Sequence, residues 1–186
     1  WPDLERCLLA QIELCEEDVE RLRLKQALAE LYQHELADPE RAISGWRDVL
    51  AQDATHARAI GALDELLTAR GDQGALVELL GHIISHVPSE LGHVLTHRRR
   101  ARLLRDDLNR PDEAADDWRA LLAWQADDLE SLVALSDIYE RAAEWALWTE
   151  LTERRLSLVD DGTQALRVKF AEVMGAELGQ RSEAEA

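Results

Sequence analysis

The sequence predicts an all-α fold, an α-solenoid of antiparallel helical hairpins. Composition is the first observation: 46% of the 186 residues are hydrophobic, 32% are charged and only 5% are aromatic. Alanine, leucine, glutamate and arginine dominate, which is typical of long helices rather than of sheets. The second observation is an internal repeat with a period of 72 residues. The third is that apolar residues recur at spacings of three and four, the spacing of one helix face.

The repeat appears without a gap when residues 36–87 are placed on residues 108–159, since fourteen of these 52 positions are then identical. Trp1 and Leu4 also lie 144 positions before Trp145 and Trp148, so the period reaches the N-terminus. The matching pairs include Leu36 and Leu108, Pro39 and Pro111, Ala42 and Ala114, Trp46 and Trp118, Arg47 and Arg119, and Leu50 and Leu122.

This period predicts a single repeat domain over residues 1–186. Residues 1–21 match the last helix of a preceding unit, residues 22–87 and 91–159 form two four-helix units, and residues 163–186 begin a further unit that is cut short. Because both ends fall inside a unit, we expect exposed apolar faces there and end-to-end self-association. The helices expected in the first four-helix unit are Leu22 to Leu36, Pro39 to Gln52, Thr55 to Arg70 and Gln73 to Val87.

Turn residues support these helix boundaries. Asp38-Pro39 supplies an N-cap followed by a proline at the first helical position. Gly71-Asp72 combines a residue suited to the left-handed end of one helix with an N-cap for the next. The second unit has Ala143 at the position of Gly71, so it must turn by other means.

The apolar spacing indicates what each helix buries. Ala42, Trp46, Val49 and Leu50 form one broad apolar face, and similar faces recur on the other helices. A hairpin cannot cover such a face alone, whereas neighbouring hairpins stacked along one axis can. Trp46 and Trp118 should therefore occupy equivalent buried environments.

These hairpins resemble tetratricopeptide repeats. The loose pattern of that family places Leu, a small residue and Tyr on the first helix of a hairpin, and Ala, an aromatic residue and Ala or Pro on the second. The resemblance implies a right-handed superhelix, although helical repeats of the HEAT kind fit the same degenerate pattern. Leu28, Ala29 and Tyr32 fit the first set, while Ala42, Trp46 and Ala54 fit the second.

In the tetratricopeptide family, the first helix of each hairpin lines a concave groove that receives a peptide or a partner helix. The resemblance therefore implies a non-catalytic scaffold without cofactors, whose partner is a protein or a peptide. Two alternatives remain: a structural spacer between flanking domains, or a regulatory segment of a larger enzyme. The implied groove residues are Arg23, Gln26, Glu30, Gln33, Arg58, Glu65, Arg98, Arg102, Arg105, Asp137 and Glu140.

The charge and the cysteines narrow the setting. A net charge of -17 opposes binding to nucleic acid or to an anionic membrane. The sequence contains no run of 18 apolar residues, the length that a helix needs to span a bilayer. Cys7 and Cys15 lie too far apart on one helix for a disulfide, so we expect small buried thiols in a reducing compartment. No secretory signal is visible at Trp1, and we expect a cytoplasmic protein.

The run His97 to Arg105 is the one concentrated basic segment of this acidic chain. Its guanidinium groups could receive an acidic peptide or a phosphate, because planar forks match such anions bidentately. The favoured interpretation is instead that these arginines pair with Asp106, Asp107, Glu113 and acidic residues on neighbouring helices, holding repeats together.

Four histidines form two pairs spaced i, i+4, namely His82 with His86 and His93 with His97. A turn between the pairs could bring four imidazoles together as zinc ligands. The residues at equivalent repeat positions, Arg154, Leu158, Ala165 and Lys169, have no such ligand character, which favours surface and packing roles over a metal site.

Enzyme motifs fail at their defining positions. His34-Glu35 lacks the second histidine of a helical zinc protease, and no glycine-rich phosphate loop or nucleophile elbow occurs. Adjacent acids such as Asp116-Asp117 lie near helix starts, where capping and the helix dipole explain them. We therefore expect no enzymatic activity.

Overall fold

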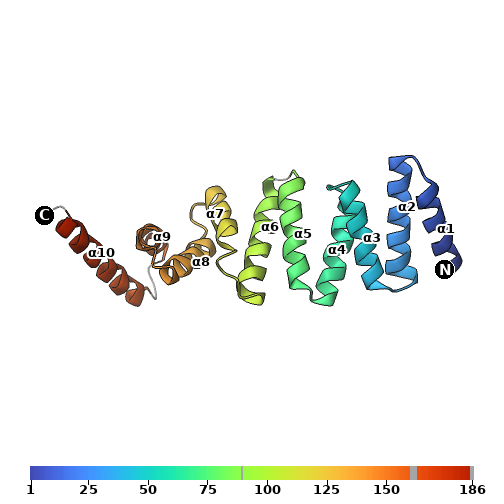
Figure 1. The fold of residues 1–186 in the computed structure, drawn as a ribbon. Helices are drawn as coiled ribbons and strands as arrows, with labels where there is room; N and C mark the ends of the chain where they lie inside the picture. Colours follow the sequence, from blue (N-terminus) through green and yellow to red (C-terminus); the bar gives the residue numbers. More distant parts are fainter. Residues whose placement is uncertain (89, 160–162, 185–186) are drawn as a thin grey trace. The chain divides into compact units, whose positions relative to one another are not determined.

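The computed structural model describes residues 1–88, 90–159 and 163–184. Its regular structure is helical over these residues and includes no strand, which confirms the all-α fold of helical hairpins (Figure 1). The chain divides into two compact units, residues 1–96 and 97–186. Each unit is described by itself.

The first unit is a row of helices that pack on their sequence neighbours, α1 on α2, α2 on α3, α3 on α4 and α4 on α5 (Figure 1). A π-helical segment, Leu31–Glu35, continues α2 to its end. The second helix begins at Asp18 rather than at the expected Leu22, and the others begin and end close to the predicted residues. The helices are α1 (Pro2–Leu14), α2 (Asp18–Glu30), α3 (Pro39–Gln52), α4 (Ala57–Arg70), α5 (Gln73–His86) and the first part of α6 (Glu90–Arg102).

The second unit repeats this arrangement from the end of α6 onward. A π-helical segment at Leu103–Asp107 is followed by α7 (Ala115–Trp124), α8 (Leu129–Arg141), α9 (Trp145–Leu158) and α10 (Gln164–Ala184). Helix α7 packs on α8, α8 on α9 and α9 on α10. Helix α7 begins four positions after Pro111, whereas α3 begins at Pro39 itself. Asp38 caps α3 by accepting from the Arg41 N–H at 3.0 Å, and Arg110, one period after Asp38, has no carboxylate for such a cap.

The backbone follows the period of 72 residues even at its strained positions. Ala37 and Asn109, one period apart, have φ angles of 49° and 51°. Gly71 and Ala143, also one period apart, have φ angles of 70° and 56°. The second unit therefore turns through the same left-handed conformation without a glycine. This conformation is less favourable for Ala143 than for Gly71, because the alanine Cβ crowds the backbone there.

The buried core follows the period as well. Trp46 and Trp118 are 1% and 0% exposed, which confirms that they occupy equivalent buried positions. Ala29 and its equivalent Ala101 are fully buried beneath them. A Cβ added at Gly45 would lie 3.0 Å from the Cβ of Ala29, so α2 and α3 approach closely at this point.

The outer face of α1 departs from the prediction. Cys7 is exposed and Cys15 is half-buried, so the expectation of two buried thiols is wrong, although neither forms a disulfide. Leu8 is the only residue of α1 that is buried in the described structure. The reason is that α1 packs mainly on α2, with Glu5 also bonded to Tyr32 and to Arg41 of α3, while the opposite face of α1 is uncovered and leaves Trp1 59% exposed and Leu14 82% exposed. No described helix combines the length and the apolar character that a bilayer crossing requires.

Candidate interaction site

Each unit has a hollow, and the two hollows share three repeat positions. The hollow in the first unit, here called hollow 1, has a volume of about 290 Å³, and hollow 2 in the second unit has a volume of about 420 Å³. Three lining positions coincide after one period: Gln33 with Arg105, Ala62 with Ala134, and Glu65 with Asp137. Hollow 1 is lined by Gln33, His34, Trp46, Arg58, Gly61, Ala62 and Glu65, and hollow 2 by Arg105, Asn109, Pro111, Ala134, Asp137, Ile138, Glu140 and Arg141.

Six of the groove residues implied by the family resemblance lie at these hollows. Hollow 1 brings together Gln33, Arg58 and Glu65 from the end of α2 and from α4. Hollow 2 likewise brings together Arg105, Asp137 and Glu140 from the end of α6 and from α8. The other five, Arg23, Gln26, Glu30, Arg98 and Arg102, do not line either hollow.

Hydrogen bonds hold the polar side chains of hollow 1 in place. The indole Nε1 of Trp46 donates to Gln33 Oε1 at 2.9 Å, which fixes the amide against the buried ring. Glu30, next to the hollow, accepts from Gln26 Nε2 at 2.8 Å and pairs with Arg58 Nε at 2.9 Å. Arg23 is outside this network and pairs with Glu20.

The basic run of the second unit pairs mostly with acids on the next helices. Arg98 contacts Asp128 at 2.8 Å and Glu130 at 3.1 Å, and Arg102 contacts Glu130 at 2.7 Å. Arg105 binds the neighbouring Asp106 at 2.6 Å and lies 3.6 Å from Glu130. These are the structural pairings favoured by the sequence, and they occupy the charges that would otherwise attract an anionic partner.

These ion pairs change the acidity of their members. The hydrogen bond from Arg102 lowers the pKa of Glu130, although burial acts in the opposite direction. For Asp128, burial raises the pKa, but hydrogen bonds from Ser131 and Arg98 outweigh it and leave the pKa below its usual range. Both carboxylates are therefore stabilised in the charged form by the basic run.

One buried polar cluster was missed by the sequence reasoning. Asp117 is fully buried and accepts two hydrogen bonds from Arg100, at 2.7 and 2.8 Å, while His97 Nδ1 lies 2.6 Å from its Oδ1. Asp117 lies in the first turn of α7, as predicted, but no side chain caps α7, so the part of the explanation that invoked capping is wrong. The repeat itself held the signal. Asp117 and Arg100 stand one period after Gly45 and Leu28, so two charged residues occupy positions that are uncharged in the first unit.

The four clustered histidines contact different acceptors. His82 Nε2 lies 2.7 Å from the Ala54 carbonyl oxygen, His86 Nδ1 lies 2.9 Å from the His82 carbonyl oxygen, and His93 Nε2 lies 2.6 Å from that of Val87. His97 is held by Asp117. Within the described ranges, no three His, Cys, Asp or Glu side chains gather as metal ligands. These contacts fit the packing roles that the sequence favours.

The hairpin pattern that carried the family resemblance is part of the core. Leu28, Ala29, Tyr32, Ala42 and Trp46 are each less than 9% exposed, and they pack where α2 meets α3. The chain is a helical repeat protein, and in this pattern its first hairpin resembles a tetratricopeptide repeat. Hollow 1 lies between the end of α2 and α4, and hollow 2 lies between the end of α6 and α8.

Comparisons with known proteins place this repeat protein among distant helical neighbours. No family model matches the chain, and the search of curated proteins found no match. The structure of a MamA RS-1 ArsTM double mutant has a TM-score of 0.46 at 15% identity, covering 87% of this chain and 97% of that one. The P58(IPK) TPR domain has a TM-score of 0.42 at 18% identity, covering 96% of this chain and 51% of that one. These values transfer no ligand or partner to this chain.

Proposed function

We propose that this repeat protein is a non-catalytic scaffold that binds a protein or a peptide through hollows 1 and 2. The observation that carries the proposal is the recurrence of a hollow at equivalent positions of both units. A spacer that only sets a distance, or a segment that only regulates an attached enzyme, gives no reason for both units to keep such a recess.

The lining of the hollows defines the chemistry of the partner. Hollow 1 presents Glu65 and hollow 2 presents Asp137, two exposed acids beside small apolar floors at Ala62 and Ala134. Arg58 and Arg105 of the same hollows are paired with Glu30 and Asp106. A polypeptide with small apolar residues flanked by basic residues fits this lining. The net charge of -17 favours a neutral or basic polypeptide over a nucleic acid or an anionic membrane.

A peptide array probed with the purified chain tests the proposal. The variant Glu65→Lys with Asp137→Lys reverses one exposed charge in each hollow, and it should reduce capture of the selected peptides by roughly tenfold or more. Glu153→Lys is the matched control, because Glu153 is an exposed acid of α9 outside both hollows, and it should leave capture unchanged. Capture that survives the double reversal would show that the partner binds elsewhere.

We also propose that the chain associates with itself through the exposed face of α1. Trp1 and Leu4 are 59% and 43% exposed. Trp148, which stands two periods after Leu4, is fully buried. Sedimentation velocity at rising concentration should show a dimer that Trp1→Glu with Leu4→Glu removes. A monomer at all concentrations in the unaltered chain would refute self-association without affecting the peptide proposal.

A further inference from the structure

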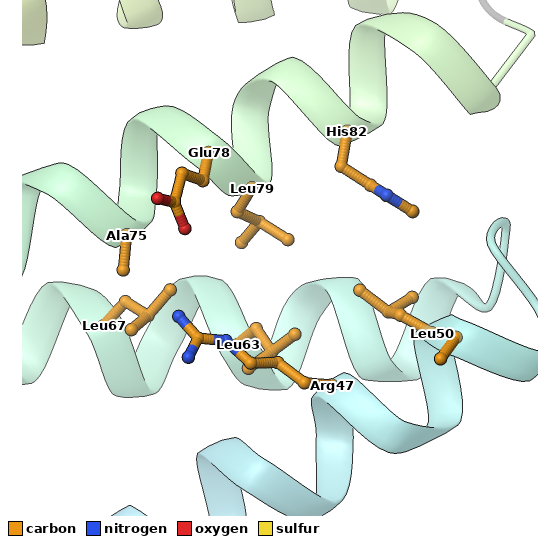
Figure 2. A pocket seen from close by; sticks show the side chains of 9 residues that line it. Arg47, Leu50, Leu63, Leu67, Ala75, Glu78, Leu79 and His82 are labelled. Carbon is orange, nitrogen blue, oxygen red and sulfur yellow. The ribbon is translucent and has the colours of Figure 1, made fainter.

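A separate pocket in the first unit lies between α3, α4 and α5, and we call it the α4–α5 pocket (Figure 2). Its volume is about 330 Å³, within the range of small-ligand sites. It shares no residue with hollow 1. Its lining consists of Arg47, Leu50, Ala51, Leu63, Leu67, Ala75, Glu78, Leu79 and His82.

The lining combines an apolar floor with three polar side chains, Arg47, Glu78 and His82, of which His82 is already held by the Ala54 carbonyl oxygen at 2.7 Å. Leu63, Leu67 and Leu79 are each at most 5% exposed and form the floor. Arg47 and Glu78 project from α3 and α5 toward the space between the helices (Figure 2). Neither of these two side chains has a hydrogen bond or an ion pair to any residue in the described part of the chain. The pocket therefore has unused hydrogen-bonding capacity beside leucine side chains.

The second unit has larger side chains at two of the equivalent positions, and one of them is buried. One period after Leu67 stands Tyr139, which is 8% exposed, and one period after Ala75 stands Leu147. The Tyr139 hydroxyl accepts from Arg119 Nε at 2.9 Å, and Arg119 is the equivalent of Arg47. The second unit thus places a phenol of its own against this arginine, whereas the first unit has two smaller side chains and a pocket.

We propose that the α4–α5 pocket binds the tyrosine side chain of a partner polypeptide. A phenol hydroxyl is both donor and acceptor, so it can accept from Arg47, as Tyr139 accepts from Arg119, and donate to Glu78. The aromatic ring then covers the leucine floor, and a ring with a polar edge suits a site that is apolar on one side and wet on the other. A phenylalanine would leave Arg47 and Glu78 without this bridge.

Two matched pairs of small probes test the proposal on the whole chain by NMR titration. The first pair is p-cresol and toluene, and the second is N-acetyl-tyrosinamide and N-acetyl-phenylalaninamide. We expect each phenol to bind more tightly than its partner without the hydroxyl, by roughly tenfold or more, because only the phenol forms charge-assisted hydrogen bonds to Arg47 and Glu78. Equal binding within the pairs would overturn the phenol site. Binding of p-cresol without N-acetyl-tyrosinamide would overturn the tyrosine side chain as the occupant.

Exchanging residues between the units locates the site. Leu67→Tyr should fill the α4–α5 pocket with the second unit's own side chain and abolish p-cresol binding. Ala75→Leu fills it from α5 and replaces this test if the first variant does not fold, as judged by circular dichroism. Arg47→Met should weaken p-cresol binding while leaving toluene binding unchanged.

The converse change gives a gain of function in the second unit. Tyr139→Leu with Leu147→Ala recreates the lining of the first unit around Arg119, and the chain should then bind a second equivalent of p-cresol. Arg119→Met in the same background should remove that second equivalent. Unchanged p-cresol affinity in both Leu67→Tyr and Ala75→Leu would show that the phenol binds outside the pocket. Because these variants leave both hollows intact, their outcome is independent of the peptide-array result.

Discussion

Arg102 and Glu130 form the ion pair that Glu30 and Arg58 form one period earlier, with the two charges exchanged. The first helix and the third helix of each set are joined at the same place in both units. The two units have opposite charges at each position, but the ion pair is present in both. The repeat therefore retains the pairing and not the individual residues.

A charge exchange in the first unit tests this pairing. Glu30→Arg alone, or Arg58→Glu alone, places like charges together and should lower the free energy of unfolding by about 0.5–1 kcal/mol, since Arg58 is 59% exposed in its side chain. The double variant recreates the arrangement of Arg102 and Glu130 and should recover most of that loss. Urea unfolding of the four chains gives the coupling energy, which should shrink in 1 M NaCl because the pair is screened. Additive losses would mean that the contact contributes nothing.

The buried Asp117 cluster should be far more sensitive. Asp117→Ala leaves Arg100 partly buried without its carboxylate, and we expect a loss of about 3 kcal/mol or more in the free energy of unfolding. Adding Arg100→Leu, the residue type of the first unit, should recover part of the loss by removing the stranded charge. Asp116→Ala is the control, because Asp116 is an exposed neighbour whose removal should cost less than about 0.5 kcal/mol. Equal effects at the two aspartates would contradict the buried position of Asp117.

Acid should weaken the second unit through Glu130. Its folded pKa is held below the ordinary value of 4.5 by Arg102, so its contribution to stability is complete above that pH and is lost as the pH falls through the lower folded value. At pH 7 we expect Glu130→Gln to be less stable than the unaltered chain by about 1 kcal/mol. The difference should narrow below pH 4.5, as measured by urea unfolding between pH 3 and pH 7. A constant difference over this range would show that Glu130 does not titrate with a lowered pKa.

Local rules predicted the parts of the fold that depend on single helices. The cap at Asp38 and the left-handed glycine at Gly71 follow from residue type alone, and the structure has both. Trp46 and Trp118 were predictable because burial repeats with the sequence. Cys7 was predicted wrongly, because its exposure depends on whether another helix covers α1, and helix periodicity cannot show that.

The site was predictable only as far as helix faces determine it. Gln33 and Arg58, both expected in a groove, line hollow 1 together, because the end of α2 and α4 each turn one face toward it. Arg98 and Arg102 were expected in a groove, but acids on α8 engage them, and that depends on how closely two helices approach. Asp117 was missed because helix-start rules explained it adequately, while its burial arises from α7 packing and from the co-located Arg100.

The left-handed turn between the third and fourth helices gives the last prediction. Ala143 and Gly71 share this conformation, with φ angles of 56° and 70°, but only Ala143 has a Cβ that crowds the backbone. Ala143→Gly should therefore raise the free energy of unfolding by about 0.5–1 kcal/mol, and Gly71→Ala should lower it by about 1 kcal/mol. Nothing lies within 4 Å of a Cβ at Gly71, so that loss would come from the backbone alone. A higher unfolding temperature for Ala143→Gly would show that the two turns are equivalent. Gly61→Ala is the control for helix propensity, because Gly61 lies in the interior of α4. If Gly71→Ala and Gly61→Ala changed stability in the same direction, the left-handed turn would not be the cause.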